Sequence, residues 1–195
     1  MRIKSERCMP VMNRLTPALF LDRDGVVNRE IGYLYKSEHV DFVPGIFELC
    51  RSAQALHYKI IILTNQAGIG RELYTEADLH SLMEWMTAQF ERERVSLDDY
   101  YYCPHHPEQA IGRYRIDCPD RKPRPGMLLR ASREHGIDLS QSLLVGDRCS
   151  DMQAGAAAGV GKLVLLAGTE VATCEVATHF TVVKTLEEVI CMIGK

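Results

Sequence analysis

Two carboxylates stand two residues apart, at Asp22 and Asp24, and Gly25 follows them directly. A glycine allows the chain to turn sharply, so both carboxylates could face one centre. One could then attack as a nucleophile while the other exchanges a proton, provided that their environments differ. The alternative is an ordinary Asp-Gly turn. A calcium loop is excluded because Val26 and Tyr33 stand where that motif needs oxygen ligands.

Three further positions carry residue types that suit phosphate chemistry. Thr64 ends an apolar run and precedes Asn-Gln-Ala-Gly, and a hydroxyl beside free backbone amides suits a phosphate oxygen. Asp147 and Asp151 are four residues apart, so they could share a helical face and hold a hard cation. Lys122 would supply a fixed positive charge. Each has a structural alternative: a polar strand end, a helix cap or a solvated lysine.

A third pattern has the character of a metal site. Cys103 and His105 form a Cys-x-His motif, and Cys118 follows fifteen residues after the first cysteine. Thiolate and imidazole groups at such spacing are typical zinc ligands. The alternative is a proline-rich loop whose cysteines are incidental.

Apolar patterning predicts the elements that must position these residues. Short apolar runs predict buried strands at 18–21, 59–64, 142–145, 162–166 and 180–183. Helical spacing predicts helices at 44–56, from Thr75, at 126–135, at about 150–158 and from Leu186. Residues 100–125 are predicted to be irregular. Residues 1–16 are polar and unpatterned, and we expect a flexible tail there, with a single domain over 17–195.

The alternation of strands and helices predicts an α/β fold with a mainly parallel sheet covered on both faces. Ligands of such sheets bind at the carboxyl ends of the strands. The polar residues named above follow predicted strands or lie between them. We therefore expect them to meet at one edge of the sheet.

Composition excludes several classes of protein. The chain has 195 residues, of which 46% are apolar and 25% charged, as in an ordinary globular domain. Its formal net charge of -3 lacks the basic surplus typical of nucleic-acid binding, so we expect no nucleic-acid partner. No apolar run reaches the ~20 residues that cross a bilayer, and no secretory signal is evident, so no membrane partner is expected.

The cysteines bear on the cellular compartment. Seven cysteines, odd in number and scattered in spacing, predict no disulfide framework and favour a reducing cytoplasm. We also expect a monomer, because the one long amphipathic helix has a single apolar stripe.

Taken together and in this order, the motifs resemble those of the haloacid dehalogenase superfamily of phosphatases. The resemblance implies a Rossmann-like three-layer sandwich and a phospho-aspartate mechanism. Asp22 would be the nucleophile, and Asp24 would protonate the leaving oxygen and then deprotonate water. Magnesium would be held by the Asp22 carboxylate, the Asp24 carbonyl and Asp147. Thr64 and Lys122 would bind the transferring phosphoryl group.

Within that superfamily, residues 20–28, 64–71, 103–107 and 121–126 resemble the family of D-glycero-D-manno-heptose 1,7-bisphosphate 7-phosphatases. The likeness extends over about residues 17–167. It implies a small phosphosugar substrate that loses its C7 phosphate during synthesis of nucleotide-activated heptose for lipopolysaccharide or related surface glycans. It also implies a short zinc loop and no large cap domain. Arg121 would contact the retained phosphate or the sugar, and the pocket rim would include Asn28, Asn65 and Arg148.

One position departs from this family. Its zinc loop usually ends in Cys-x-Cys-Arg-Lys-Pro, whereas here Asp120 takes the place of the second cysteine. Two alternatives follow. Asp120 completes a mixed zinc site with Cys103, His105 and Cys118, because zinc accepts a carboxylate. Otherwise the loop holds no zinc and depends on its prolines and packing.

Three other functions compete with this interpretation. Histidinol-phosphate phosphatases share the scaffold, but their cysteine loop is typically shorter. A polynucleotide 3′-phosphatase would need a basic groove and stacking aromatic residues. A non-catalytic zinc- or phosphosugar-binding module would not require both Asp22 and Asp24.

Overall fold

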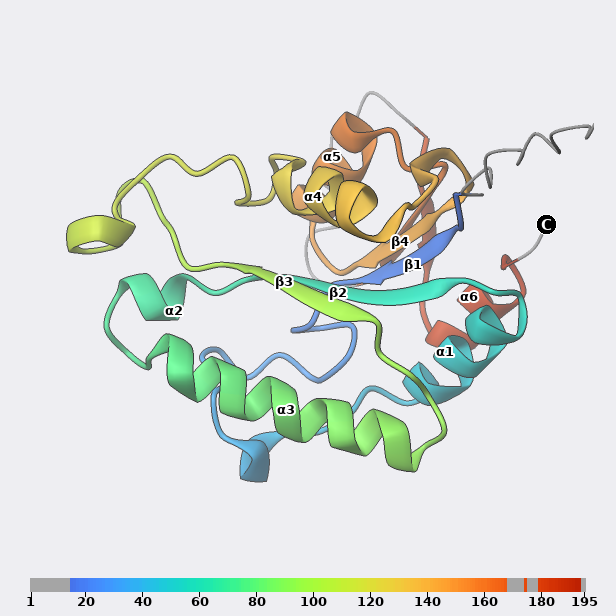
Figure 1. Ribbon diagram of the computed structural model, residues 1–195, viewed down its shortest axis with the longest axis horizontal. Coiled ribbons are helices and arrows are strands. Elements are labelled where there is room, and N and C mark those ends of the chain that lie inside the picture. The colour runs from blue at the N-terminus through green and yellow to red at the C-terminus, as the bar shows by residue number, and fades with distance from the viewer. Residues whose placement is uncertain (1–14, 168–173, 175–178, 194–195) are drawn as a thin grey trace, which may run out of the picture.

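The computed structural model describes residues 15–167, 174 and 179–193, and these form a six-stranded sheet with helices on both faces (Figure 1). All neighbouring strands are parallel, in the order β3-β2-β1-β4-β5-β6. The strands are β1 (Ala18–Leu21), β2 (Lys59–Asn65), β3 (Asp99–Cys103), β4 (Leu143–Gly146), β5 (Lys162–Leu166) and β6 (Thr181–Val183). The α-helices are α1 (Ile46–Ala55), α2 (Ala67–Gly70), α3 (Glu76–Arg92), α4 (Gly126–His135), α5 (Cys149–Ala158) and α6 (Leu186–Ile190).

The molecule has three layers. Helices α1, α3 and α6 cover one face of the sheet, and α4 and α5 cover the other (Figure 1). Leu19 and Leu21 pack into the core on the first face, whereas Phe20 packs into the core on the second. Because both faces are covered, the central strands are apolar throughout. The expected α/β three-layer fold is confirmed, and no insertion within the described residues is as large as a cap domain.

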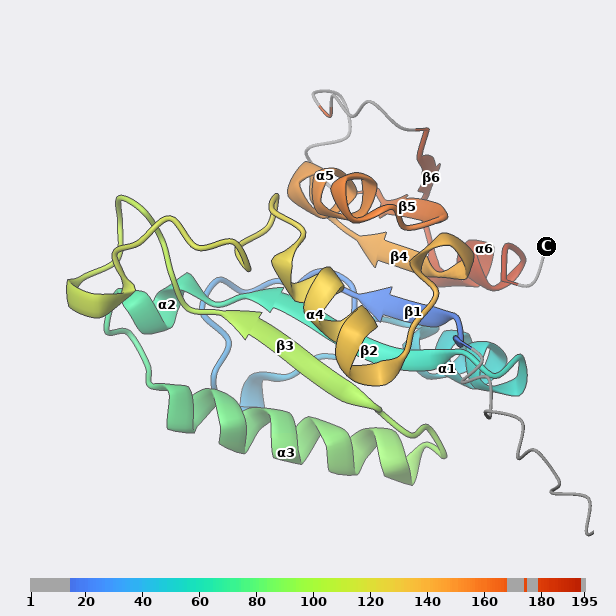
Figure 2. The same ribbon diagram turned by 45° about the horizontal axis from the view of Figure 1, so that its top comes forward.

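Strand order brings the ends of β1, β2 and β4 together. β1 pairs with β2 on one side and with β4 on the other, where Leu21 aligns with Ile62 and Val145. The backbone N–H of Asp22 continues this ladder by donating to the Val145 carbonyl at 3.0 Å. In Figure 2 the arrowheads of β1, β2 and β3 point toward the side that carries α2 and the long segment before α4. Residues that follow these strands therefore share one edge of the sheet.

The edge strand β3 was not expected, because residues 100–125 were predicted to be irregular. Its three tyrosines alternate between the faces: Tyr100 and Tyr102 pack against the α3 side, and Tyr101 packs on the α4 side. The Tyr101 hydroxyl donates to Glu134 at 2.6 Å, and the Tyr102 hydroxyl donates to Glu76 at 2.5 Å. Each tyrosine combines an apolar ring with a polar hydroxyl. Three tyrosines in a row therefore show no alternation of polar and apolar residue types from which the strand could be predicted.

A disulfide joins Cys149 and Cys174, whose Cα atoms are 5.1 Å apart. No spacing pattern predicts this pair, and the expectation from the sequence concerned only a framework of several disulfides. Cys149 is the first residue of α5, and Cys174 lies between β5 and β6. The pairing therefore depends on the tertiary fold. Cys50, Cys103 and Cys118 are buried free thiols.

The expected tail at 1–16 lies outside the described residues except for its last two positions. Thr16 is already part of the fold, since its N–H donates to the Gly136 carbonyl at 3.0 Å. We propose that residues 17–195 form a single domain. Within the part of the chain that the structure describes, no helix is long and apolar enough to cross a membrane.

Replacing Phe90 by Ala should destabilise the protein strongly. Phe90 is fully buried on α3 and packs edge-on against Phe42 and Phe47, so truncation should cost ~3–5 kcal/mol in the free energy of unfolding. The control Leu129→Ala, at a 38% exposed position, should change it by about 0.5 kcal/mol or less. Urea unfolding followed by circular dichroism measures both. Equal losses in the two variants would contradict this account of the core.

Candidate active site and metal centres

Asp22 follows β1 directly, and only 7% of its surface is exposed. The Lys122 ammonium lies 2.8 Å from Asp22 Oδ1 and 2.6 Å from Asp151 Oδ1, and it donates to the Leu63 carbonyl at 2.9 Å. The backbone N–H of Arg23 donates to Asp22 Oδ1 at 2.8 Å. Both contacts of the Asp22 carboxylate involve Oδ1, so Oδ2 is the oxygen available to attack an electrophile.

Burial and charge act in opposite directions on these groups. Burial raises the pKa of Asp22 well above its ordinary value; Lys122 acts to lower it, and the Asp151 and Asp147 carboxylates raise it further. Burial acts to lower the pKa of Lys122, but attraction to Asp151 and Asp22 outweighs this effect and leaves that pKa above its usual value. Lys122 is therefore a fixed cation, as expected from the sequence.

Asp24 is held by three side chains. Arg23, which is 1% exposed, forms a bidentate pair with Asp24, with its Nε 3.1 Å from Oδ1 and its Nη2 2.8 Å from Oδ2. Asn28 Nδ2 donates to Oδ1 at 3.0 Å, and Gln66 Nε2 donates to Oδ2 at 3.1 Å. Asn28 was expected at the pocket rim, but it is fully buried and its amide is bonded to Asp24. Arg23 and Gln66 were not singled out, although both lie inside the recognised motifs.

Gln66 connects Asp24 to the Thr64 hydroxyl. Its Nε2 also donates to Thr64 Oγ1 at 2.7 Å, and its Oε1 accepts a hydrogen bond from the Tyr74 hydroxyl. Burial raises the pKa of Tyr74 to about 12, so this hydroxyl remains a donor at neutral pH. The chain from Tyr74 through Gln66 thus fixes two polar groups at the ends of β1 and β2.

Two further carboxylates, those of Asp147 and Asp151, lie beside that of Asp22. One oxygen each of Asp22, Asp147 and Asp151 lies within 4.8 Å of the others, a spacing that suits a divalent cation. Asp147 Oδ1 is buried without a hydrogen-bond partner, as expected of a metal ligand. Gly25 has φ of 92°, and a Cβ there would lie 2.2 Å from Asp147 Oδ2, so this approach requires glycine.

Asp151 has a second role that the sequence did not distinguish from that of Asp147. It is completely buried, pairs with Lys122 and accepts the Arg148 backbone N–H at 3.1 Å. Asp147 is less enclosed. Burial, followed by the Asp151 charge, raises the pKa of Asp147 to about 6.

A cavity of about 580 Å³ opens over these groups and is lined by Asp22, Asp24, Thr64 and Lys122. Asn65 also lines it and fixes the lysine backbone. Its Oδ1 accepts the Lys122 N–H at 3.1 Å, and its Nδ2 donates to the Lys122 carbonyl at 3.0 Å. The predicted nucleophile, acid and phosphate-binding groups therefore face one space.

Three arginines line the same cavity: Arg71, Arg121 and Arg148. Arg71 donates to the Tyr33 hydroxyl, and its guanidinium lies 5.8 Å from the centre of that ring. Arg148 pairs with Glu30 at 2.9 Å. Arg121 and Arg148 were predicted at this place, whereas Arg71, the last residue of the 64–71 motif, was not. The cavity lining thus combines the carboxylates of Asp22 and Asp24 with the guanidinium groups of three arginines.

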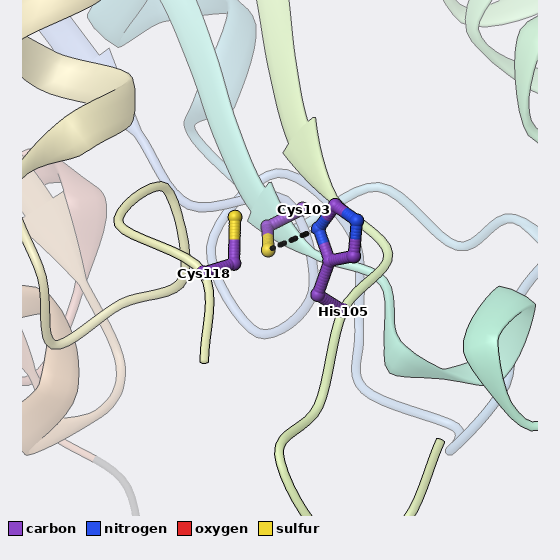
Figure 3. Close-up of side chains that lie close together, drawn as sticks. All are labelled: Cys103, His105 and Cys118. Atoms are coloured by element: carbon purple, nitrogen blue, oxygen red, sulfur yellow. Dashed lines mark hydrogen bonds between the residues drawn. The ribbon is translucent and has the colours of Figure 1, made fainter. Parts of the chain in front are cut away.

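Cys103, His105 and Cys118 form a second cluster, on the segment that leads from β3 to α4 (Figure 3). One ligand atom of each lies within 4.8 Å of the others, and Cys103 Sγ is 3.7 Å from His105 Nδ1. Burial raises the pKa of the Cys103 thiol to about 12. Asp120, the expected fourth ligand, does not belong to this cluster. Its Oδ2 accepts a hydrogen bond from Arg130 Nη1 at 2.9 Å.

Arg121 connects the Cys-His cluster to the active-site cavity. Its Nη1 donates to the backbone carbonyl of His105 at 3.1 Å while its side chain lines the active-site cavity. His106 accepts the backbone N–H groups of Glu108 and Gln109 on Nδ1 and so closes a turn.

Replacing Asp147 by Asn should stabilise the metal-free protein. The folded pKa of about 6 exceeds the ordinary value of 3.8, so the Asp147 contribution to stability falls as pH rises through this interval. In chelator, the gain from D147N should therefore be larger at about pH 8 than at about pH 5. The variant should also lose most of the stabilisation that Mg²⁺ gives the wild type.

Thermal unfolding with EDTA at both pH values, and with MgCl₂ at the higher one, measures these effects. The exposed Glu84→Gln on α3 is the control and should show neither. A D147N variant that is stabilised by Mg²⁺ as much as the wild type would remove Asp147 from the cation site.

Comparison with known proteins gives consistent results. A model of the HAD-hydrolase-like family matches residues 120–189. The D-glycero-alpha-D-manno-heptose-1,7-bisphosphate 7-phosphatase of Burkholderia mallei is 52% identical over 149 residues, which are 76% of this chain and 79% of that protein. The D-glycero-beta-D-manno-heptose-1,7-bisphosphate 7-phosphatase of Yersinia pestis is 41% identical over 164 residues, or 84% of this chain and 87% of that protein.

A solved structure extends the likeness to three dimensions. The D,D-heptose 1,7-bisphosphate phosphatase from B. bronchiseptica, complexed with magnesium and phosphate, matches with a TM-score of 0.78 and 27% identity. The match covers 91% of this chain and 97% of that one. Sequence identity, coverage and fold agree, and the chain belongs to the heptose 1,7-bisphosphate 7-phosphatase family of haloacid dehalogenase-like hydrolases.

Proposed function

We propose that this protein removes the C7 phosphate of D-glycero-D-manno-heptose 1,7-bisphosphate through a phospho-aspartate intermediate on Asp22. The observation that carries the proposal is the pairing of a buried Asp22 with Lys122 at the base of a cavity whose walls hold three arginines. A bisphosphate needs two separate cationic regions, one at the reacting phosphate and one at the retained phosphate. The cavity lining holds the Lys122 ammonium for the first and three guanidinium groups for the second.

The first half-reaction transfers the phosphoryl group to the protein. Asp22 Oδ2 attacks phosphorus, and the bond between phosphorus and the C7 oxygen breaks. Asp24 gives its proton to the departing oxygen, and Arg23, Asn28 and Gln66 keep the carboxyl in position. Lys122 and the Thr64 hydroxyl bind the phosphoryl oxygens and offset their developing charge.

The second half-reaction releases inorganic phosphate. Asp24, now ionised, takes a proton from water, whose oxygen attacks phosphorus, and the bond from phosphorus to Asp22 breaks. Magnesium would be held by the carboxylates of Asp22 and Asp147 and by the Asp24 carbonyl. When bound, it supplies charge neutralisation between the anionic substrate and the aspartates. The unpartnered Asp147 Oδ1 supports this assignment.

We assign the retained phosphate at C1 to Arg71, Arg121 and Arg148. These guanidinium groups line the same cavity as Lys122, and planar guanidinium groups are suited to bidentate phosphate contacts. Their placement also explains how a chain with a net charge of -3 can bind a strongly anionic sugar. The positive charge is local.

We further propose the alpha anomer as the preferred substrate and the cytoplasm as the site of action, with the protein acting as a monomer. Identity to the relative named for the alpha anomer is 52%, against 41% to the Yersinia relative named for the beta anomer. The product would enter nucleotide-activated heptose synthesis for lipopolysaccharide or related surface glycans. In a reducing cytoplasm Cys149 and Cys174 would be thiols.

Phosphate release should be fastest from the alpha anomer of heptose 1,7-bisphosphate, with magnesium present and one phosphate released per sugar. Rates from the beta anomer and from histidinol phosphate are measured beside it. D22N should reduce release to background, and D24N should reduce kcat by ~10²–10⁴-fold. Preference for histidinol phosphate would keep the mechanism and overturn the substrate. Full activity in D22N would overturn the mechanism.

Arg121→Ala should weaken recognition of the bisphosphate selectively. Loss of a charged hydrogen bond worth about 1.5–3 kcal/mol should lower kcat/KM by ~10- to 150-fold. Hydrolysis of 4-nitrophenyl phosphate, which has no second phosphate, should change little. The control Arg133→Ala, at an exposed position of α4 outside the cavity lining, should behave like the wild type. Equal losses on both substrates would indicate that Arg121 acts on the reacting phosphate or on the fold instead.

A further inference from the structure

The cluster of Cys103, His105 and Cys118 offers two sulfur atoms and one nitrogen atom to a metal ion. The three ligand atoms lie within 4.8 Å of one another, and the sulfur of Cys103 faces the ring nitrogen of His105, with Cys118 beside them (Figure 3). Both cysteines are buried, and His105 is partly buried. Two thiolates and an imidazole suit a thiophilic divalent ion such as Zn²⁺, which prefers four ligands in tetrahedral geometry.

The residue that could supply a fourth ligand is committed elsewhere. Asp120 Oδ2 accepts a hydrogen bond from Arg130 Nη1 at 2.9 Å, and the Arg130 guanidinium lies over the Tyr101 ring at 4.8 Å. Asp120 Oδ1 lies against Gly126, where a Cβ would approach it to 2.4 Å. Gly126 begins α4, and the positive end of a helix favours a carboxylate. Turning Asp120 toward the sulfur atoms would remove these contacts.

Beside the cluster there is space for a small molecule. A cavity of about 440 Å³, separate from the active-site cavity, is lined by His105, Asp120, Arg130 and Tyr114, among others. A ligand from solution can therefore approach the side of the loop that carries the imidazole. Sites with three protein ligands and an accessible fourth position are those in which zinc exchanges water and other small donors.

We propose that Cys103, His105 and Cys118 alone bind a thiophilic divalent ion, and that its fourth position is open to an exchangeable small donor such as water or a free imidazole. Asp120 serves the loop differently, as an anchor that ties it to α4 through Arg130. The site thus keeps three protein ligands. Asp120, which stands where the family's usual loop has a cysteine, forms an ion pair with Arg130 instead.

The test uses the full chain loaded with Co²⁺, whose visible spectrum reports its ligands. Wild type and Asp120→Asn should bind one Co²⁺ at this cluster with the same spectrum, because the Asp120 carboxylate is not a ligand. Asp120→Cys should shift the bands and strengthen the sulfur-to-cobalt absorption, since a third thiolate fills the open position. Cys118→Ser should lose the wild-type spectrum.

Titration with imidazole then probes the open position. The wild-type spectrum should change saturably while Co²⁺ remains bound, and that of Asp120→Cys should not change. Failure of the wild type to bind Co²⁺, a spectrum that imidazole leaves unchanged, or an Asp120→Asn spectrum that differs from wild type would overturn the proposal. The wild-type titration decides the question even if a variant does not fold, and neither readout requires phosphatase activity.

Discussion

The site depends on one buried cation, the Lys122 ammonium. A charge taken out of water is tolerated only where opposite charges and acceptors surround it. Asp22 after β1, the Leu63 carbonyl in β2 and Asp151 in α5 supply these partners, so one ammonium group joins three elements at the carboxyl edge of the sheet. Without it, two buried carboxylates would lack a counter-charge, and breaking such a pair typically costs ~3–5 kcal/mol.

The segment from β3 to α4 links this cation to the cavity wall. Arg121 and Lys122 are consecutive, yet the lysine pairs with Asp22 while the arginine lines the cavity wall and bonds the His105 carbonyl. Asn65, the last residue of β2, bonds both the N–H and the carbonyl of Lys122. It thereby fixes the backbone from which the two side chains extend in different directions. A metal ion on the Cys-His cluster would restrain His105 and, through its carbonyl, Arg121. A metal ion bound outside the cavity would therefore act on the position of Arg121, which lines the cavity, without a direct contact.

The sequence predicted the groups whose chemical type and place after a strand are both distinctive. Asp22, Thr64 and Asp147 follow apolar runs that strand periodicity identifies, and the strand boundaries agree with the structure to within two residues. Arg23 and Gln66 could not be predicted, because their roles depend on the direction of a side chain and not on residue type. The role of Asp120 depends on Arg130, a partner on α4 that no local pattern connects to the loop.

The balance of charge explains why this arrangement also calls for a metal ion. Three carboxylates, those of Asp22, Asp147 and Asp151, share a small volume with one ammonium group. A second lysine could neutralise the excess negative charge, but its side chain would occupy space that a phosphoryl group needs. An ammonium group also cannot coordinate oxygen atoms as a metal ion does. A small divalent ion adds two charges and can exchange its oxygen ligands between water and phosphate. Burial, followed by the charges of the neighbouring carboxylates, raises the pKa values of Asp22 and Asp147, and a bound cation would offset both effects.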